Sequence, residues 1–237
     1  MRPPTFTHER ELRQAGHLPI GVDEAGCGCL AGPVVAAACV LPLDSRMGLI
    51  RDSKLLSRPQ RERLLEEFRH RGYRWATGIA SVEEIDRLNI RNATYLAMRR
   101  AIEQLLDDGS SKSKAQNPKQ DQRSNAENLD SKLVLNFGRR TSSISTRPFA
   151  LVDAWTIPDL PIPQRGIVHG DRLVKSIAAA SIVAKCTRDA LMDTLDQQFP
   201  QYGFHAHRGY ATVAHREAIR RFGASVNHRL TFRLTVG

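Results

Sequence analysis

The chain has 237 residues, of which 41% are hydrophobic and 25% are charged, a balance typical of a folded globular protein and not of a fibrous or disordered one. The sequence shows neither an apolar run near the roughly 20 residues that span a membrane nor an apolar secretory leader, so we expect a cytoplasmic protein that makes no membrane contact. Lysine and arginine exceed aspartate and glutamate by 35 to 25, and this net charge of +10 makes nucleic acid the first partner to consider.

Three segments in the first third of the chain predict β-strands. Residues 18–25 and 33–41 are short apolar runs on either side of a glycine-rich turn, which together indicate a hairpin. Residues 73–80 alternate well enough between apolar and polar side chains to form a third strand. We therefore expect a sheet that begins with a hairpin.

Two capping boxes predict helix starts in the same region. Ser57 with Gln60, and Ser81 with Glu84, have the spacing at which a cap and the third helical residue satisfy each other's backbone amides. Apolar residues then recur at helical spacing after Ser81, and they predict a helix that ends near Leu106.

The composition changes abruptly over residues 107–147, where Ser, Lys, Gln, Asn and Asp dominate. Such a segment buries too little apolar surface to offset the entropy lost on ordering, so we expect a flexible polar insertion in a surface loop. The next apolar strand, residues 149–152, ends on Asp153, and residues 166–169 lead as a strand-like segment to Asp171.

The last part of the chain is mostly helical. A helix that begins near Leu173 carries small residues at 177–181, which would let it lie very close to a sheet, and it continues towards Phe199. Residues 209–222 are again helical, and a basic tail follows at 227–233. A hairpin followed by alternating strands and helices indicates an α/β fold, with a mixed central sheet flanked by helices in a single domain.

Four acidic residues stand where a predicted strand or strand-like segment ends: Asp23, Glu24, Asp153 and Asp171. Neighbouring strand ends bring distant residues into one pocket, where carboxylates within ~4 Å repel by about 4 kcal/mol per pair at an effective dielectric near 20. Such a cluster must protonate, spread out or bind cations. Oxygen-only ligands favour Mg²⁺ or Mn²⁺, and two such ions can hold the attacking and leaving oxygens of a phosphodiester.

Each acid also has a structural interpretation that the sequence leaves open. Asp23 and Glu24 can polarise the following turn, Asp153 can start a turn, and Asp171 can cap the next helix. Consecutive strand residues point to opposite faces, so Asp23 and Glu24 share a pocket only if the chain leaves the strand there. The glycines of the following turn tolerate positive φ and would permit such a departure.

Basic, hydroxyl and histidine side chains give further candidates. The possible phosphate contacts are Lys54, Lys175, Lys185, Arg188, Ser53 and Ser176. For the cations, the competing interpretation is a solvated helix face. His205, His207 and His215 lack Cys or Glu partners at the short spacings of zinc sites, so we expect a local structural or phosphate-contact role for them.

Long stretches of the sequence resemble ribonuclease HII. They are GVDEAGCGCLAGPVVAAACVL from Gly21, DSKLLS from Asp52, EEIDRLNI from Glu83, LVDAW from Leu151, GDRLVKSIAAASIVAKCTRDALM from Gly170, FPQYGFHAHRGY from Phe199 and NHRLTF from Asn227. These words follow the order of the family and cover nearly the whole chain outside the insertion.

The resemblance implies a ribonuclease H-like fold and a metal-dependent endonuclease. Such an enzyme hydrolyses the RNA strand of RNA/DNA hybrids and cuts 5′ of ribonucleotides embedded in duplex DNA, leaving 3′-hydroxyl and 5′-phosphate ends. The residues that match the family's metal ligands and catalytic acids are Asp23, Glu24, Asp153 and Asp171. The resemblance also assigns Gly26-Cys27-Gly28 to the ribose 2′-hydroxyl and Tyr210 to stacking on the sugar at the RNA to DNA junction. We expect a monomer with no obligatory protein partner.

Three positions depart from the family pattern. Cys27 replaces the usual arginine between two glycines, so one cation is missing beside the acids, whereas recognition through the backbone of Gly26 and Gly28 would survive. Cys29 replaces the residue after the second glycine, and Ala154 replaces the glycine after Asp153, which leaves the local loop geometry open.

The unusual thiols suggest two further interpretations. A thiol beside a glycine-rich turn can be exposed and oxidisable, which would give a redox role, whereas a zinc site would need a second close pair that the sequence lacks. The alternative function is a catalytically impaired nucleic-acid-binding protein of the same fold, and the presence of all four acids argues against it.

Overall fold

The computed structural model of the chain describes residues 3–43, 50, 52–107 and 147–234. Its centre is a five-stranded sheet in the order β3-β2-β1-β4-β5. The strands are β1 (His17–Ala25), β2 (Val34–Val40), β3 (Arg74–Ala80), β4 (Arg147–Asp153) and β5 (Gln164–Ile167). The β1–β2 and β2–β3 pairs are antiparallel, whereas β1–β4 and β4–β5 are parallel. The expected hairpin and mixed sheet are therefore confirmed.

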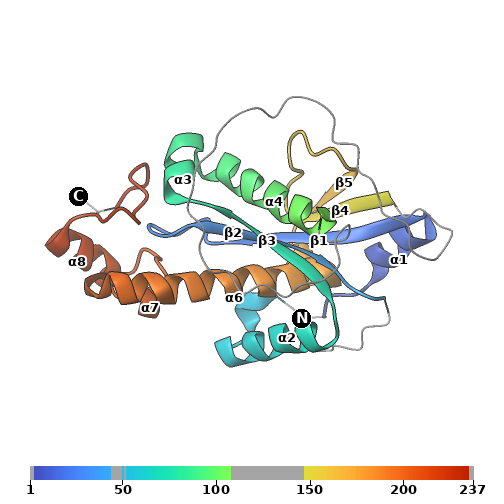
Figure 1. Ribbon diagram of the computed structural model, residues 1–237, viewed down its shortest axis with the longest axis horizontal. Coiled ribbons are helices and arrows are strands. Elements are labelled where there is room, and N and C mark those ends of the chain that lie inside the picture. The colour runs from blue at the N-terminus through green and yellow to red at the C-terminus, as the bar shows by residue number, and fades with distance from the viewer. Residues whose placement is uncertain (1–2, 44–49, 51, 108–146, 235–237) are drawn as a thin grey trace.

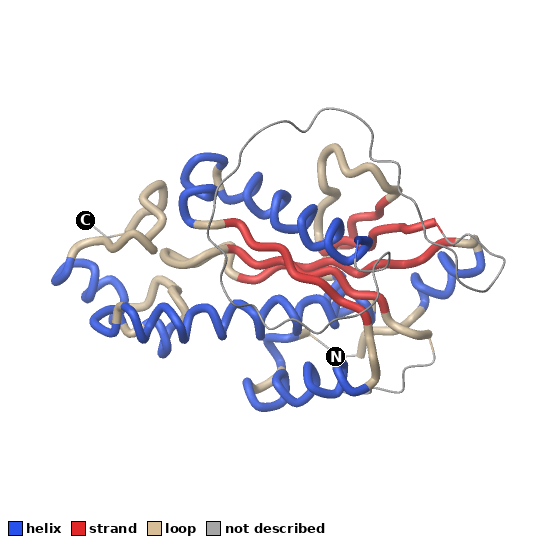
Figure 2. The backbone as a smooth tube through the Cα atoms, in the orientation of Figure 1, coloured by secondary structure: helices blue, strands red, loops and turns tan. Residues whose placement is uncertain are grey.

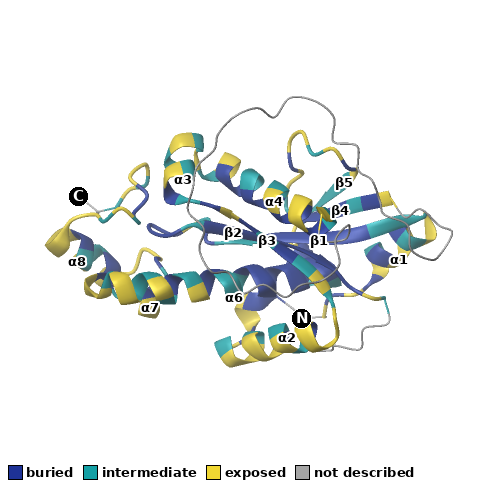
Figure 3. Ribbon diagram, viewed as in Figure 1, coloured by how far each residue is buried: buried dark blue, intermediate teal, exposed yellow. Residues whose placement is uncertain are grey.

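Helices cover both faces of the sheet (Figure 1). One face packs against α4 (Ile90–Asp107), and the other packs against α6 (Lys175–Gln198), with α2 (Arg58–His70) on the outer side of α6. Strand β2 and the middle of β1 are buried, whereas β5 is only partly buried and β3 has exposed residues (Figure 3). A separate apolar cluster fills the space on each side of the sheet.

Helix α6 lies very close to β1, as its small residues predict. A Cβ atom added to Gly21 of β1 would lie only 2.1 Å from the carbonyl carbon of Ser176. Three alanines of α6, Ala178–Ala180, are fully buried against the same face of the sheet. This close approach brings the first turns of α6 beside the end of β1.

Shorter helices complete the described residues, with α1 at one end of the molecule and α7 and α8 at the other (Figure 1 and Figure 2). They are α1 (Thr7–Gln14), α3 (Val82–Leu88), α5 (Gly170–Leu173), α7 (Phe204–His207) and α8 (Val213–Phe222), with the 3-10 turns η1 (Ser53–Leu55) and η2 (Pro200–Tyr202). Helix α1 was not anticipated. None of the helices that the structure describes is long and apolar enough to cross a membrane.

The helix predicted from Ser81 to Leu106 is in fact two helices. The capping box at its start is present, because Glu84 N donates to Ser81 Oγ and Ser81 N donates to Glu84 Oε2. Asn89 then adopts a left-handed φ of 68°, which ends α3, and its side chain caps α4 by accepting from Asn92 N. Asparagine tolerates this conformation better than most residues, and apolar spacing alone does not register such a break.

Two predictions about the C-terminal part are also corrected. Helix α8 starts at Val213 and not near residue 209, because Thr212 caps it by accepting from His215 N. The basic segment 227–233 is not a solvated tail, since Arg229 is fully buried and Ala31 and His228 form a β-bridge. The predicted insertion at 107–147 lies outside the described residues, apart from its two end residues in α4 and β4.

Candidate active site

Three of the four acids lie where the parallel pairing of β1 and β4 stops. The last paired residues are Val22 and Val152. Beyond them, Asp23 and Glu24 remain in β1 and pair only with β2, and Asp153 ends β4 beside β5. The carboxylates therefore gather at a gap between two neighbouring strands near the middle of the sheet.

Asp23 and Glu24 point to opposite faces of the sheet. Asp23 lies on the α6 side, where the hydroxyl of Ser181 hydrogen-bonds to it, whereas Glu24 lies on the α4 side and accepts from Cys27 Sγ at 3.5 Å. The chain leaves the strand only at Gly26, after both acids, because β1 continues through Ala25. What brings the two acids towards a common centre is instead the end of β4 at Asp153.

Asp171 joins this group through a short helix. Asp153 Oδ1 accepts a hydrogen bond from Gly170 N at 2.6 Å, which ties the start of α5, and with it Asp171, to the end of β4. The Nζ atom of Lys54 lies 3.7 Å from Asp171 Oδ2, while 78% of its side chain is exposed. We call Asp23, Glu24, Asp153 and Asp171 the carboxylate cluster.

Among the residues that the structure describes, the negative charges of the carboxylate cluster are not balanced by an equal number of nearby positive charges. Burial, and then the charges of Glu24 and Asp153, raise the pKa of Asp23 well above its ordinary value. Burial and Asp153 raise the pKa of Glu24, and burial with Asp52 and Asp153 raises that of Asp171. Since each acid makes its neighbours harder to ionise, the cluster would be stabilised by a cation.

The residues present fit a hard divalent cation in their chemistry. Oxygen-only donors suit Mg²⁺ or Mn²⁺, and such an ion would offset the repulsion between these carboxylates. Within the described part of the chain, no three His, Cys, Asp or Glu side chains are already gathered in a way that could hold a metal ion. The carboxylates stay apart because like charges repel. In addition, Asp23 Oδ1 accepts from Glu24 N, and Asp153 Oδ1 accepts from Gly170 N.

A fifth acid, Asp52, supports Lys54 and was not among the predicted site residues. Asp52 is buried and accepts from Lys54 N at 2.9 Å and from Arg172 Nε at 3.2 Å. Although partial burial acts in the opposite direction, the charges of Asp171 and Asp52 raise the pKa of Lys54. Lys54 is thus a charged, exposed side chain at the edge of the carboxylate cluster, as a phosphate contact requires.

The remaining predicted phosphate contacts lie elsewhere. Ser53 is buried and its hydroxyl pairs with that of Ser181 at 2.9 Å, so Ser181, which sequence reasoning missed, links Ser53 to Asp23. Ser176 is buried and its backbone N donates to Glu9 of α1. Lys175 lies over the ring of Phe6, with Nζ 5.8 Å from its centroid.

Of the two glycines in the turn after β1, only Gly26 occupies a position that requires glycine. Gly26 has a φ of 101°, and a Cβ atom there would lie 2.1 Å from Arg188 Nε. Gly28 has open space around it and is not among the described residues with positive φ. Gly26 is therefore required for the close packing of the turn, whereas Gly28 leaves its backbone accessible.

Cys27 is an inert thiol in this turn. Its Sγ contacts Glu24 Oε1 and lies 3.2 Å from Thr94 Oγ1 of α4. Burial, and then the charge of Glu24, raise the pKa of Cys27 to about 12. Because the thiolate is the reactive form, this environment argues against the redox role that the sequence suggested.

Two fully buried arginines, Arg188 and Arg229, pack against the inner side of the turn. We call them the arginine clamp. Arg229 donates to the carbonyl oxygens of Gly26, Cys27 and Gly32 at 2.8, 3.0 and 2.8 Å. Arg188 donates to the carbonyl oxygens of Pro33, Ala31 and Arg208. The prediction that Arg188 contacts phosphate is therefore wrong, and no periodicity in the sequence marks either arginine as buried.

Tyr210 is presented beside this turn and is 45% exposed, so it is not a core aromatic. Gly209 O accepts from Leu30 N at 2.8 Å, and a Cβ on Gly209 would lie 2.5 Å from Ala31 O. Tyr210 O is 2.9 Å from His215 Nδ1. The backbone that carries Tyr210 is thus fixed directly onto the loop that follows the glycine turn.

Behind Tyr210 lies a buried histidine cluster, formed by His207, His215 and His228. The rings of His207 and His215 stack at 4.2 Å, and His215 Nε2 is 3.1 Å from His228 Nε2. Burial lowers the pKa of His215 to about 4, and burial also lowers the pKa values of His207 and His228. The cluster has the structural role expected for His207 and His215.

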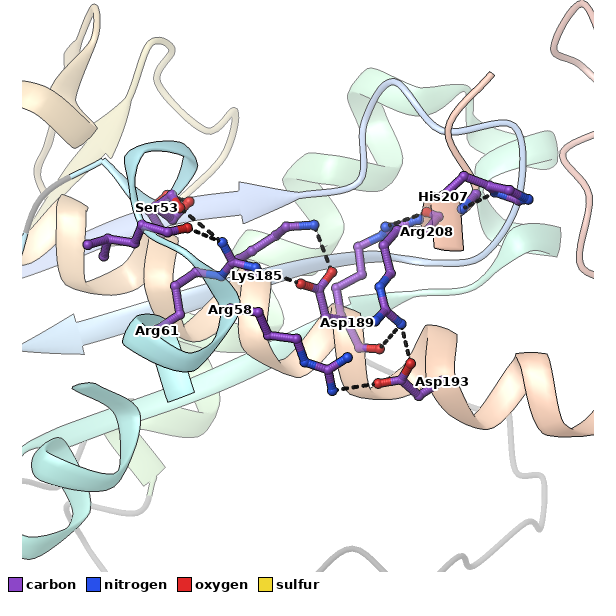
Figure 4. Close-up of polar contacts among 12 residues, drawn as sticks. Ser53, Arg58, Arg61, Lys185, Asp189, Asp193, His207 and Arg208 are labelled. Carbon is purple, nitrogen blue, oxygen red and sulfur yellow. Dashed lines mark hydrogen bonds and ion pairs between the residues drawn. The ribbon is translucent and has the colours of Figure 1, made fainter. Parts of the chain in front are cut away.

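Two acidic residues of α6 pair with basic side chains of α2, of α6 and of the segment after α7 (Figure 4). Asp189 pairs with Lys185 at 2.7 Å and with Arg61 at 3.1 Å. Asp193 pairs with Arg58 at 2.8 Å and also with Arg208. Lys185, predicted as a phosphate contact, therefore has a carboxylate partner, while its Nζ lies 5.8 Å from the centroid of the Tyr210 ring.

Comparisons with known proteins agree with this architecture. The model of the ribonuclease HII family matches residues 20–147 and 151–235. A ribonuclease HII from Desulfitobacterium hafniense is 42% identical over 226 residues, which cover 94% of this chain and 72% of the relative. A ribonuclease HII from Syntrophotalea carbinolica is 40% identical over 230 residues, which cover 97% of this chain and 92% of the relative.

Solved structures with low sequence identity share the fold. The structure of a PCNA:RNase HII complex from Archaeoglobus fulgidus matches with a TM-score of 0.64 at 22% identity, covering 93% of this chain and 97% of that one. Bst-RNase HIII in complex with Mn²⁺ matches with a TM-score of 0.62 at 18% identity, covering 94% of this chain and 70% of that one. The expected ribonuclease H-like fold is confirmed, and the extent of the sequence match shows that the chain belongs to the ribonuclease HII family.

Proposed function

We propose that this endoribonuclease hydrolyses the RNA strand of RNA/DNA hybrids and cuts on the 5′ side of ribonucleotides embedded in duplex DNA, leaving 3′-hydroxyl and 5′-phosphate ends. The observation that carries the proposal is the gap between β1 and β4, beside which Asp23, Glu24 and Asp153 lie, and where burial and the charge of Asp153 raise the pKa values of Asp23 and Glu24. A buried group of like charges is costly for stability, so its presence favours a functional role.

The carboxylate cluster would hold divalent metal, Mg²⁺ or Mn²⁺, through the side chains of Asp23, Glu24, Asp153 and Asp171. When bound, such ions would lower the pKa of water and neutralise the charge that develops on the phosphate. Lys54 would bind a substrate phosphate, a role supported by its exposed Nζ, which lies 3.7 Å from Asp171 Oδ2. Ser181 and Ser53 would orient Asp23 from the α6 side.

Ribonucleotide recognition would come from the backbone of Gly26, Cys27 and Gly28, together with the exposed face of Tyr210. The 2′-hydroxyl distinguishes RNA from DNA, and a rigid backbone reads a hydroxyl without needing a particular base. The arginine clamp occupies the inner carbonyl oxygens of this turn, so it keeps the turn rigid. We further propose that the chain acts as a cytoplasmic monomer without an obligatory protein partner.

One assay tests the proposal against its alternative, a catalytically impaired nucleic-acid-binding protein of the same fold. Duplex DNA with a single ribonucleotide, an RNA/DNA hybrid and an all-DNA duplex are each incubated with Mg²⁺, Mn²⁺ or EDTA. We expect cleavage of the first two substrates with metal, and of none in EDTA. Binding without cleavage under every metal condition would favour the impaired protein.

A further inference from the structure

A pocket lies beside the carboxylate cluster on the α4 side of the sheet. Its volume is about 230 Å³, and it opens between α4 and the turn that follows Asp153. Its walls are mainly apolar and aromatic, with Glu24 and Asp153 at one edge. The pocket is also lined by Cys27, Tyr95, Met98, Arg91 and Trp155.

Trp155 is an exposed aromatic residue whose backbone is fixed by a hydrogen-bonded turn. Its relative exposure is 69%, although its backbone N donates to Asp153 O at 2.7 Å. Ala154 before it adopts a left-handed φ of 58° and donates to Ile167 O. A Cβ on Gly166 would lie 3.0 Å from Ala154 O, so glycine is what lets β5 support this turn closely. Left-handed backbone at a non-glycine residue is costly and is concentrated at functional sites.

Arg91 places a cation at the mouth of the same pocket. It is exposed near the start of α4, and its guanidinium carbon lies 6.0 Å from the centroid of the Trp155 ring. An arginine over an aromatic ring is a common platform for nucleobases, because both groups offer flat faces for stacking. Arg91 can also neutralise a phosphate that flanks a base bound in the pocket.

The charges around the pocket decide which part of a nucleic acid fits it. Glu24 and Asp153 would repel a phosphate inside, whereas the apolar walls and the Trp155 face favour an uncharged planar ring. Asp153 and Trp155 are two residues apart, a separation of at most about 7 Å along the chain. Since nucleotides along a strand repeat every ~3.4 Å, the bound base belongs close to the scissile phosphate.

We propose that Trp155, Arg91 and this pocket bind one unpaired nucleobase next to the scissile phosphate. The inference rests on the proposed function, because it places the scissile phosphate at the carboxylate cluster. A base enters such a pocket only after leaving the duplex stack, and this costs least where the base is mismatched or already unpaired. The site therefore makes the protein prefer ribonucleotides that lie beside a mismatch or a junction.

Tryptophan fluorescence tests this directly, because the chain has only two tryptophans, Trp75 and Trp155. A Trp75→Phe variant keeps Trp155 as its single tryptophan reporter. It is titrated in EDTA, so that binding is measured without cleavage, with three duplexes that carry one ribonucleotide. The neighbouring nucleotide is paired in the first duplex, mismatched in the second and lacks its base in the third.

We expect quenching of Trp155 and about tenfold tighter binding for the mismatched duplex, on the order of one base–aromatic stacking contact. The duplex without the base should bind like the paired one. Trp155→Ala and Arg91→Gln should remove the advantage of the mismatch. Val213→Ala, at an exposed apolar side chain of α8, is the matched control and should retain it.

Equal binding of the mismatched and base-free duplexes, or no change in Trp155 fluorescence, would overturn the inference. Thermal melting checks that each variant is folded. If the protein cleaves ribonucleotide substrates but shows no preference for the mismatched duplex, the proposed function stands and the nucleobase site is refuted. If the mismatched duplex quenches Trp155 but no substrate is cleaved in Mg²⁺ or Mn²⁺, the proposed function is refuted and the nucleobase site stands.

Discussion

The carboxylate cluster and the arginine clamp are both buried groups of charge, but only one of them is balanced. Each guanidinium of the clamp donates to carbonyl oxygens of several residues, and Arg229 alone reaches Gly26, Cys27 and Gly32. The acids of the cluster instead lie around the end of β4, where burial and the charge of Asp153 raise the pKa values of Asp23 and Glu24. The arginines of the clamp find their hydrogen-bond acceptors within the protein, whereas the negative charge of the cluster would be stabilised by a bound cation.

This difference separates the parts that hold the site together from the part that we propose does chemistry. Buried polar groups that are fully hydrogen-bonded stabilise a fold, and removing one partner leaves the others unsatisfied. Buried like charges do the opposite and are retained for function. Substitutions in the two regions should therefore change stability in opposite directions, which the following predictions test.

The largest effect should come from Asp23→Asn in the carboxylate cluster. Loss of this charge should reduce kcat by about 1,000-fold, because metal-based charge stabilisation is worth several kcal/mol and each ~1.4 kcal/mol is a factor of ten. In EDTA, the same variant should be more stable than the parent by ~1 kcal/mol, since repulsion is relieved. The measurements are steady-state cleavage and chemical denaturation.

The control for this variant is Asp159→Asn, at an exposed carboxylate outside the cluster. It should change neither property. A loss of stability for Asp23→Asn in EDTA would show that Asp23 has a structural role and would break the contrast between the two regions.

Arg229→Met in the arginine clamp should mainly reduce stability. It leaves the carbonyl oxygens of Cys27 and Gly32 without their donor, whereas Gly26 O still accepts from Cys29 N. At about 1–3 kcal/mol for each carbonyl oxygen that stays buried and unsatisfied, we expect a loss of at least ~2 kcal/mol. The loosened turn should also discriminate less between ribonucleotide and all-DNA substrates. Urea denaturation and the ratio of the two kcat/KM values measure these effects. Arg233→Met, at an exposed arginine, is the control, and equal stability of the two variants would refute the role of the clamp.

The histidine cluster should make the fold sensitive to mild acid. Burial lowers the pKa of His215 from its ordinary value of 6.5 to about 4. Below pH 6.5 the unfolded chain therefore takes up a proton at His215 that the folded chain does not bind. Stability should fall as the pH drops from 6.5 to about 4, by about 3 kcal/mol, and then level off for this group. The free energy of unfolding measured across this range should lose part of its slope in His215→Gln, whereas His70→Gln, at an exposed side chain, should keep it. An unchanged slope in His215→Gln would contradict the assignment.

The smallest effect concerns the turn between Asp153 and Trp155. Ala154 has a left-handed φ of 58°, a conformation that costs an alanine about 1–2 kcal/mol and that glycine adopts without this cost. Glycine also makes the unfolded chain more flexible, which offsets part of the stabilisation. Ala154→Gly should therefore stabilise the protein by about 0.5–1 kcal/mol, which corresponds to an increase in Tm of about 1–3 °C. Ala76→Gly, at a buried alanine of β3 on the other side of the sheet, is the control and should instead lower the Tm. A lower Tm for Ala154→Gly would mean that the turn does not carry strain.

Local signals in the sequence predicted most of the sheet and helices. The apolar runs that became β1 and β2 and the capping boxes at Ser57 and Ser81 act over a few residues, so their physics can be read along the chain. The break at Asn89 was missed because one residue with positive φ does not disturb the apolar spacing on either side of it. The residues of the carboxylate cluster were named through the family resemblance, since strand-end acids alone have ordinary structural explanations.

The sequence by itself therefore determined the family, the mixed α/β fold and the identity of the candidate acids. Only the tertiary structure decided that Asp23 and Glu24 lie on opposite faces of the sheet, that Ser181 reaches Asp23, and that the half-buried Cys27 thiol contacts Glu24 and Thr94. It also decided the role of Arg229, which hydrogen-bonds to Gly26 from 203 positions away. Burial and hydrogen bonding between such distant segments depend on how the chain packs, and no local pattern in the sequence encodes them.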